Sequence, residues 1–463
     1  MIDWRRPVVF THRWLGITLG LLFAMWFATG IIMMYARMPE LGEARRLAHL
    51  APLDLSTAAV PLDALDTPGQ GAAIERVRIG MLLGRPVYRA RVSGSWFTRF
   101  ADTGEPLPGI NAAQAIDEAR RFAPEHAGTI RYDRRLTEPD QWTLEIRRQL
   151  PLHRVTLGDA DGRELYLSER TGEVILETTR QARRLAYAGA VLHWLYFTPF
   201  RRHTAVWSQS IIWLSIAGSV MCTLGLVWGT YTGARSPYRG WMRWHHYAGL
   251  AFGVVSFTWI FSGLLSMNPL DWQGATTPTA AERGAFSGGP LRLHEVALES
   301  LRSLMLSKEV EIVQFRGQPR LLVDGRAPHS IGRELLLTAA RDAVPGATVQ
   351  DAAWLDAYDS YYYDRNREQP LPVLRVRFAD PRGTWLYIDP NSGSILRKEE
   401  RLSRLNRWLY HGLHSLDFPF LYGRRPLWDI VVISLSLGGI ASVVTAAMPA
   451  WRRLRRHARR LYS

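Results

Sequence analysis

Four long apolar stretches without charged residues dominate the hydropathy pattern of the chain. They cover residues 16–36, 204–234, 247–270 and 430–450. A helix needs about 20 such residues to cross a bilayer, so each stretch predicts a transmembrane helix. No small-residue cleavage site follows the first stretch, and we therefore expect a retained helix rather than a signal peptide.

Two long polar regions separate these spans and contain the alternating pattern of short strands. Strands are expected at 86–92 and 372–378, and short helices at 112–122, 294–305 and 334–343. Three turns that close on a glycine are expected at 100–104, 166–172 and 387–393. Glycine suits the positive φ of such turns. The pattern predicts α+β domains built on antiparallel sheets, with two units in each region.

The chain is a duplication of one helix–region–helix unit. The first and third spans share five landmarks at equal spacing, which are His12, Gly16, Gly20, Trp26 and Gly30, and His245, Gly249, Gly253, Trp259 and Gly263. Similar motifs precede the second and fourth spans, around His193 and His414. Both copies cross the membrane in the same direction, so an axis along the membrane normal relates the halves. The glycines at four-residue spacing are expected to allow close helix packing.

Arginine marks one side of the membrane. The three stretches at that side contain Arg5 and Arg6, then Arg235, Arg239 and Arg243, then Arg452, Arg453, Arg455, Arg456, Arg459 and Arg460. Positive charge favours the cytoplasm, so both termini are expected inside. The expected helices are 8–36, 204–231, 245–270 and 427–450. The other segments are extracytoplasmic regions 37–203 and 271–426, a cytoplasmic loop 232–244 and a basic cytoplasmic tail 451–463.

Composition narrows the possible chemistry. The chain has 463 residues, of which 47% are apolar and 21% charged, and it has one cysteine, Cys222. One thiol excludes internal disulfides, thiolate zinc sites, iron–sulfur clusters and covalent c-type haem. The net charge of +15 lies mainly beside the spans. This placement indicates membrane lipid, not nucleic acid, as the anionic partner.

Four of the thirteen histidines occupy positions that suit a metal cofactor. His12 and His245 open the first and third spans, and His193 and His414 lie just outside the second and fourth. Repeat-equivalent residues can face each other across a pseudo-twofold axis. Two facing imidazoles would suit the iron of a b-type haem, which needs no cysteine. The alternative is that each ring only makes hydrogen bonds at the membrane surface.

Two neighbouring histidines leave the assignment open. His411 lies three residues before His414 on the same helical face, so either could be the outer ligand. His246 adjoins His245 but points about 100° away on a helix. The histidines of the outer regions, expected to be ordinary surface residues, are His49, His126, His153, His294 and His329.

These motifs resemble the PepSY-associated transmembrane family. The resemblance rests on His-x-x-x-Gly at both span starts, on hairpins ending in Thr-Gly or Ser-Gly, and on the stretch NRWLYHGLHSLDFPFLYGRRPLWD. It implies a four-helix inner-membrane protein with periplasmic PepSY-like domains, similar to haem-containing ferric-siderophore reductases. It also implies that His12, His245, His193 and His414 are haem ligands.

The sequence-based interpretation is therefore a membrane protein with two b-type haems that transfers electrons, with no catalytic side chain of its own. The electron donor would be a quinol or a cytoplasmic flavoprotein, and the favoured acceptor is an extracytoplasmic ferric chelate. An arginine rim would bind either this anionic substrate or lipid headgroups, and comprises Arg201, Arg202, Arg404, Arg407, Arg424 and Arg425. The alternative is a membrane-anchored module that binds peptide or regulates a protease without redox activity.

Overall fold

The computed structural model describes residues 3–65, 73–304, 307–364 and 368–461. The chain forms two compact units. The membrane unit comprises Met1–Met38, Ala182–Gln273 and Arg404–Ser463, and the sheet unit comprises Pro39–Gln181 and Gly274–Ser403. Each unit therefore takes segments from both halves of the duplication.

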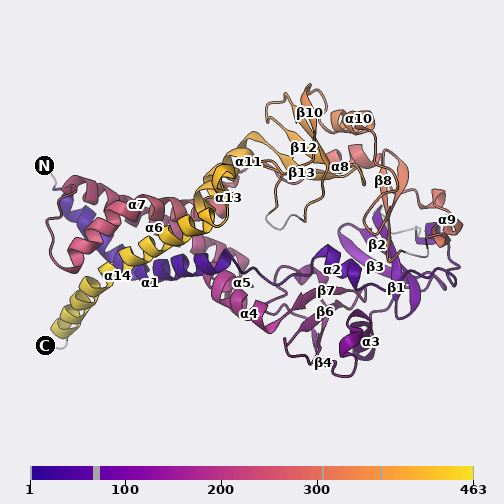
Figure 1. Ribbon diagram of the computed structural model, residues 1–463, viewed down its shortest axis with the longest axis horizontal. Helices are drawn as coiled ribbons and strands as arrows, with labels where there is room; N and C mark the ends of the chain where they lie inside the picture. The colour runs from indigo at the N-terminus through magenta and orange to yellow at the C-terminus, as the bar shows by residue number, and fades with distance from the viewer. Residues whose placement is uncertain (1–2, 66–72, 305–306, 365–367, 462–463) are drawn as a thin grey trace. The chain divides into compact units, whose positions relative to one another are not determined.

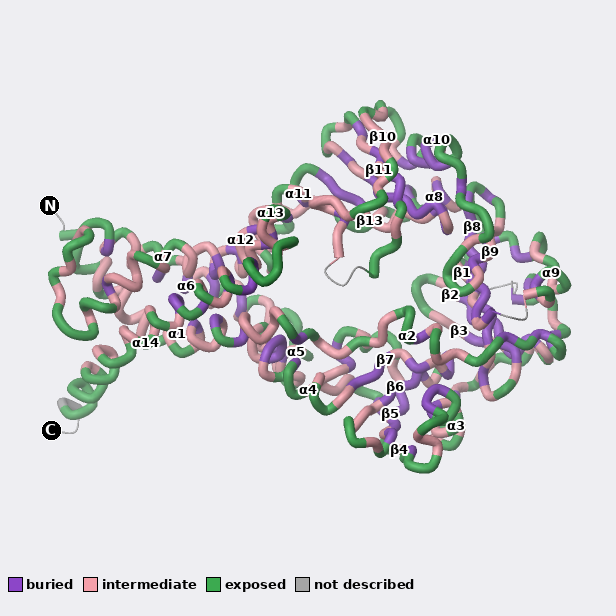
Figure 2. The backbone as a smooth tube through the Cα atoms, in the orientation of Figure 1, coloured by how far each residue is buried: buried purple, intermediate pink, exposed green. Residues whose placement is uncertain are grey.

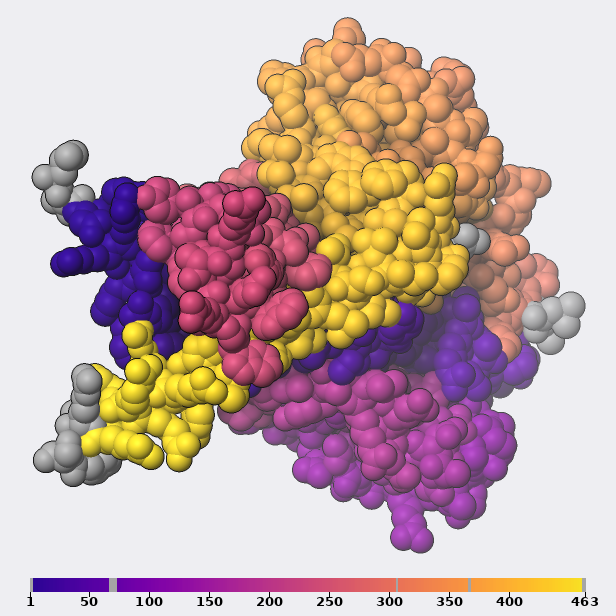
Figure 3. Space-filling model, turned by 60° about the vertical axis from the view of Figure 1, so that its left-hand side comes forward, coloured from indigo at the N-terminus to yellow at the C-terminus, as the bar shows by residue number. Residues whose placement is uncertain are grey.

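Four long helices build the membrane unit, as predicted. They are α1 (Arg5–Met33), α6 (Thr204–Thr232), α7 (Trp241–Ser266) and α14 (Leu427–Leu461). All four are long and apolar enough to cross a membrane. α1 and α7 each contact both α6 and α14, so the helices form a closed four-membered bundle (Figure 1). In Figure 3, α14 (yellow) lies beside the rose surface of α6 and α7.

Some boundaries differ from the expected ones. α14 continues as a helix through most of the predicted basic tail, and its last turns diverge from the other three helices (Figure 1). Short segments before α6 and α14, which lie within the expected outer regions, also belong to the membrane unit. They contain α5 (Thr198–Arg201), α12 (Leu413–Ser415) and α13 (Pro419–Tyr422), together with the later residues of α4 (Arg180–Ala186) and α11 (Arg401–Asn406).

Only some of the glycines at four-residue spacing in α1 and α7 allow close helix packing, as predicted for all of them. A Cβ on Gly253 would lie 2.8 Å from Leu226, which marks a close helix approach. A Cβ on Gly249 would meet nothing within 4 Å, so its expected packing role is wrong. The closest approaches involve glycines of the other two helices, such as Gly439, whose Cβ would lie 2.5 Å from Phe27.

The sheet unit contains three antiparallel sheets. Region one provides β1 (Ile74–Leu82), β2 (Arg85–Val92), β3 (Ser95–Phe100), β4 (Arg131–Leu136), β5 (Leu152–Thr156), β6 (Glu164–Ser168) and β7 (Val174–Thr178). Region two provides β8 (Val310–Phe315), β9 (Gln318–Val323), β10 (Val349–Leu355), β11 (Val373–Phe378), β12 (Trp385–Ile388) and β13 (Ile395–Glu399). The strand orders are β3-β2-β1-β8-β9, β4-β5-β6-β7 and β10-β11-β12-β13.

The five-stranded sheet joins the two outer regions, which the sequence pattern did not predict. β1 pairs with β8 in the register Val77↔Ile312 and Ile79↔Val310. All four of these side chains are fully buried. The two predicted units in each region are therefore one complete four-stranded sheet and one part of a shared sheet.

Each four-stranded sheet is covered by an amphipathic helix on one face. α3 (Ala112–Phe122) packs Ala115 and Ala119 against β5 and β6, and an Asn111–Gln114 capping box fixes its start. α10 (Arg333–Ala343) packs in the same way against β11 and β12. Figure 2 shows buried positions (purple) on α10 and on the strands. Both helices agree with the predicted ranges.

The other helices of this unit are short. They are α2 (Glu43–Ala48), α8 (Ala280–Ser287) and α9 (Leu298–Arg302). The helix predicted at 294–305 is interrupted, because Val296 has an extended backbone between a 3-10 turn and α9. The last residue of that predicted range lies outside the described residues.

The hairpin glycines hold the four-stranded sheets against the shared sheet. Gly172 has a φ of +71°, and a Cβ there would lie 2.3 Å from Leu82. The repeat-equivalent Gly393 has a φ of +72°, and its Cβ would lie 2.4 Å from Phe315. Both the backbone conformation and the close contact require glycine at these turns.

A buried arginine links three parts of the sheet unit. Arg46 of α2 makes two hydrogen bonds to Glu309, at 2.6 and 3.0 Å, and its side chain is 10% exposed. It also bonds Glu43 and lies 3.6 Å from Glu173 in the β6–β7 turn. The hydrogen bonds from Arg46 lower the pKa of Glu43. One guanidinium therefore contacts carboxylates from three separate segments.

We expect Arg46→Met to destabilise the sheet unit strongly, because it leaves the buried Glu309 without its hydrogen-bonded cation. The expected cost is about 3–5 kcal/mol. Calorimetry of the full chain in detergent should place the melting transition of this unit on the order of 10 °C lower. Arg120→Met removes a half-exposed pair with Asp117 and should change the transition little. Equal effects of the two variants would contradict the assigned role of Arg46.

Candidate functional site

The rings of His12 and His245 lie against each other at one end of the bundle. His12 is the eighth residue of α1 and His245 is the fifth residue of α7. Their ring centroids are 6.2 Å apart and the ring planes differ by 29°. α6 approaches His12 so closely at Gly225 that a Cβ there would lie 2.6 Å from the ring.

Hydrogen bonds fix the proton of both rings on Nδ1. His12 Nδ1 lies 2.9 Å from the carbonyl oxygen of Met221, and His245 Nδ1 lies 2.9 Å from that of Ser442. A carbonyl only accepts, so Nδ1–H donates and Nε2 keeps its lone pair. Met221 and Ser442 are separated by the same 221 residues as His193 and His414, so the two acceptors are repeat-equivalent.

The second pair, His193 and His414, lies near the opposite end of the bundle. Their ring centroids are 6.1 Å apart and the ring planes differ by 78°. His193 Nδ1 lies 3.0 Å from Thr29 Oγ1, and His414 Nδ1 lies 3.0 Å from Ser262 Oγ. Thr29 and Ser262 are again repeat-equivalent.

The hydroxyl groups act as acceptors for these rings. Thr29 Oγ1 donates its own proton to the carbonyl of Met25 at 2.7 Å, and Ser262 Oγ donates to that of Trp259 at 3.0 Å. Each hydroxyl has one proton, so it can only accept from the neighbouring Nδ1–H. His414 Nδ1 also lies 3.0 Å from the Trp259 carbonyl. All four histidines therefore carry the proton on Nδ1 and a lone pair on Nε2.

Unusual backbone surrounds both outer histidines. A π-helical turn precedes each of them, Tyr187–Val191 before His193 and Arg407–Gly412 before His414. Leu195 and Leu416, each two residues after the histidine, have φ values of +52° and +51°. Such leucines are strained, and π-helical turns are frequent at functional sites. The same π-helical turn and positive-φ leucine flank both histidines, which indicates that the local backbone fixes the direction of each ring.

Tryptophan indoles hold the chain around the outer histidines. Trp207 Nε1 donates to the carbonyl of Trp194 at 3.0 Å, and Trp428 Nε1 donates to that of Ser415 at 2.9 Å. Trp26 Nε1 donates to the carbonyl of His193 itself at 2.8 Å. The repeat-equivalent Trp259 is different. Its buried Nε1–H has no hydrogen-bond partner in the part of the chain that the structure describes.

Each pair presents two imidazole nitrogens that keep a lone pair. Within the described residues, no group of three or more His, Cys, Asp or Glu side chains could hold a metal. Two imidazoles on one metal, with bonds of about 2 Å, have ring centroids about 6 Å apart, as both pairs do. A two-ligand set is too small for structural zinc but suits a metal with a macrocycle of its own.

The comparison with known families agrees with this architecture. A family model described as "PepSY-associated TM region" matches residues 10–285. The chain belongs to the PepSY-associated transmembrane family. The match includes α1, α6 and α7, with His12, His193 and His245, whereas His414 and α14 are related to it through the internal repeat. A search of curated proteins gave no significant match.

The structure separates the four paired histidines of this PepSY-associated protein from their neighbours. His414, not His411, is the ring that lies against His193. His411 lies beside Tyr410, with ring centroids 4.5 Å apart. His246 Nε2 bonds the Gly233 carbonyl at the end of α6 at 2.9 Å, so it serves the helix connection.

Two expectations about polar side chains are wrong. His153 is 3% exposed and is not a surface residue, because its ring bonds Tyr132 and the Ile110 carbonyl inside the sheet unit. Arg407 is 4% exposed and donates to the carbonyl of Asp417 at 2.8 Å. It therefore cannot belong to an exposed arginine rim. Arg201 and Arg425 lie over tryptophan rings at the ends of α6 and α14.

We expect Trp26→Phe to destabilise the membrane unit more than Trp259→Phe when nothing is bound between the outer histidines. Both changes remove the same atoms, but only Trp26→Phe leaves a carbonyl, that of His193, without its donor. The expected difference is about 1–2 kcal/mol. Thermal unfolding in detergent of preparations without a cofactor absorption band measures it. An equal loss for both variants would mean that the Trp259 indole has a protein acceptor.

Proposed function

We propose that this protein transfers electrons across a membrane through two b-type haems, one held by His12 and His245 and the other by His193 and His414. The observation that carries the proposal is the shared arrangement of the four rings. Each uses Nδ1–H on a fixed acceptor and keeps Nε2 as the basic nitrogen, in pairs whose centroids are 6.2 and 6.1 Å apart. Metal-binding histidines are typically oriented by such a bond from the other ring nitrogen.

The haem assignment follows from the number and type of ligands. A b-type haem brings four equatorial nitrogens, needs two axial ligands and requires no cysteine. When bound, it supplies the one-electron redox chemistry. Trp259 supports the outer site independently, because a buried indole N–H without a protein acceptor can donate to an acceptor on a bound group.

The residues of this chain would hold and insulate the two sites. The carbonyls of Met221 and Ser442 and the hydroxyls of Thr29 and Ser262 keep the four imidazoles in the ligating tautomer. The distance from His12 to Thr29 along α1 is 17 residues, or about 25 Å of helix. The buried core of the bundle between these levels includes Phe23 and Phe27, which exclude water.

The proposed direction of transfer is from the cytoplasm outward, in a bacterial inner membrane with both termini inside. The arginine excess beside α1, α7 and α14 supports this orientation. A quinol or a cytoplasmic flavoprotein would donate to the pair near the termini. The outer pair would reduce an extracytoplasmic ferric chelate of the siderophore type, and each electron converts one Fe(III) to Fe(II).

We expect protein purified in mild detergent from haem-replete cells to be red, with a Soret band that sharpens on reduction with dithionite. A pyridine haemochrome assay should give two b-type haems per chain, because each of the two facing histidine pairs would hold one. A colourless preparation would contradict the redox function. It would favour the peptide-binding or protease-regulating module instead.

Double histidine variants should show which residues share a haem. His12→Ala with His245→Ala, or His193→Ala with His414→Ala, should each leave one haem per chain, because one pair stays intact. His12→Ala with His193→Ala should leave none, since both sites lose an axial ligand. The haemochrome assay measures all three combinations.

His411→Ala and His246→Ala serve as matched controls in that experiment. Both rings adjoin a proposed ligand without facing its partner, so both variants should keep two haems. Retention of one haem by the His12 and His193 double variant would show that these two residues belong to one site. That result would overturn the proposed pairing.

A further inference from the structure

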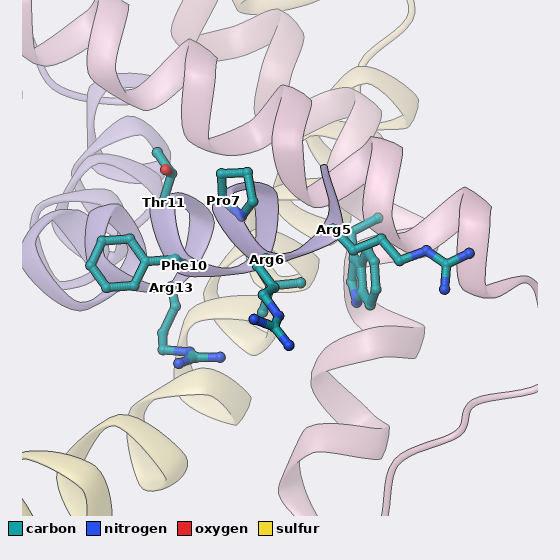
Figure 4. Close-up of a pocket in the computed structure, with 8 residues that line it drawn as sticks. Arg5, Arg6, Pro7, Phe10, Thr11 and Arg13 are labelled. Carbon is teal, nitrogen blue, oxygen red and sulfur yellow. The ribbon is translucent and has the colours of Figure 1, made fainter. Parts of the chain in front are cut away.

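A hollow of about 630 Å³ lies beside the first turns of α1, on a face of the bundle (Figure 4). Its lining residues come from α1 and, through one side chain, from α6, and are Arg5, Arg6, Pro7, Val9, Phe10, Thr11, Arg13 and Trp228. Figure 4 shows the side chains of Arg6 and Arg13 extending from the same side of α1. The hollow is separate from the histidine pairs, none of which contributes to its lining.

Every charged residue of this hollow is an arginine. Arg13 is also close enough to Arg453 of α14 for the two cations to repel each other. Within the described residues, neither Arg13 nor Arg453 has an ion-pair partner. Asp3 lies 3.5 Å from Arg6, and both of these side chains are largely exposed. The site therefore has an excess of positive charge and no buried acid to balance it.

The remaining wall of the hollow is apolar. Phe10 is 59% exposed, and Val9 and Trp228 also line the hollow. Trp4, which is 43% exposed, stacks edge-on against Trp228 and Tyr231. Exposed aromatic rings at the end of a membrane helix are typical of the level of the lipid headgroups. The arginines and the apolar wall of the hollow thus lie together at the level of the bilayer where the headgroup of a phospholipid joins its acyl chains.

We propose that this hollow binds one anionic phospholipid. Arg6 and Arg13 hold its phosphate, and Phe10, Val9 and Trp228 contact the glycerol and the start of an acyl chain. Arginine is suited to phosphate because its planar guanidinium donates several hydrogen bonds. A choline headgroup carries its own cation, which the three arginines repel, so a lipid with net negative charge is preferred. The site does not depend on haem binding or on electron transfer.

Native mass spectrometry of the full-length protein tests the proposal. The protein is exchanged into detergent micelles containing equal amounts of phosphatidylglycerol and phosphatidylcholine. We expect one retained phosphatidylglycerol per chain and at least tenfold less phosphatidylcholine. Inorganic phosphate at the same concentration should not displace the lipid. Equal retention of both lipids, or displacement by phosphate, would overturn the assignment.

Matched variants distinguish lipid binding in this hollow from nonspecific attraction to the positively charged surface. Arg6→Gln with Arg13→Gln should lower phosphatidylglycerol retention at least fivefold. Arg235→Gln with Arg239→Gln removes the same charge at the same end of the bundle, outside the hollow, and should retain the lipid. Arg6→Lys with Arg13→Lys keeps the charge and should retain most of it, which excludes misfolding as the cause of the loss. Unchanged retention in the first variant would contradict the site.

Discussion

The hydrogen bond from each Nδ1–H to a neighbouring helix is the interaction on which the arrangement of the site depends. In the first half it joins His12 of α1 to α6, and His193 before α6 back to α1. The second half repeats this between α7 and α14. Each bond stays within one half of the duplication. The two basic Nε2 atoms of a pair therefore belong to different halves, and a metal held by both would crosslink the halves across the pseudo-twofold axis.

The duplication is exact enough in the membrane to place these contacts but is unequal outside it. His12 and His245 are 233 residues apart, whereas His193 and His414 are 221 apart, so the first outer region is the longer one. The two regions also differ in what they contribute to the shared sheet, which takes three strands from region one and two from region two. The difference in length between the two halves lies in the sheet unit, so the histidine pairs of the membrane unit keep equivalent positions.

The sequence predicts the parts of this fold that depend on local pattern. The four spans, the helices α3 and α10 and the four paired histidines follow from hydropathy, periodicity and repeat spacing. The β1–β8 pairing does not, because it joins strands more than 200 residues apart and leaves no trace in either strand alone. Burial of His153 and Arg407 is equally hidden, since it depends on tertiary partners. The π-helical turns also escape prediction, because their apolar sequences are compatible with an ordinary α-helix.

One break in the symmetry of the outer site concerns Trp26 and Trp259. The His193 carbonyl accepts from Trp26, but the Trp259 indole N–H, on the α7 side, has no acceptor among the described residues. A buried donor of this kind costs free energy unless a bound group satisfies it, by about 1–3 kcal/mol. A symmetric site would hold a cofactor in two orientations with equal affinity. A single unsatisfied donor on one side would make the two orientations unequal. An acceptor at one edge of the cofactor could bond to Trp259 in only one orientation. For the proposed cofactor, the asymmetry would therefore select an orientation that the duplicated histidines alone cannot select.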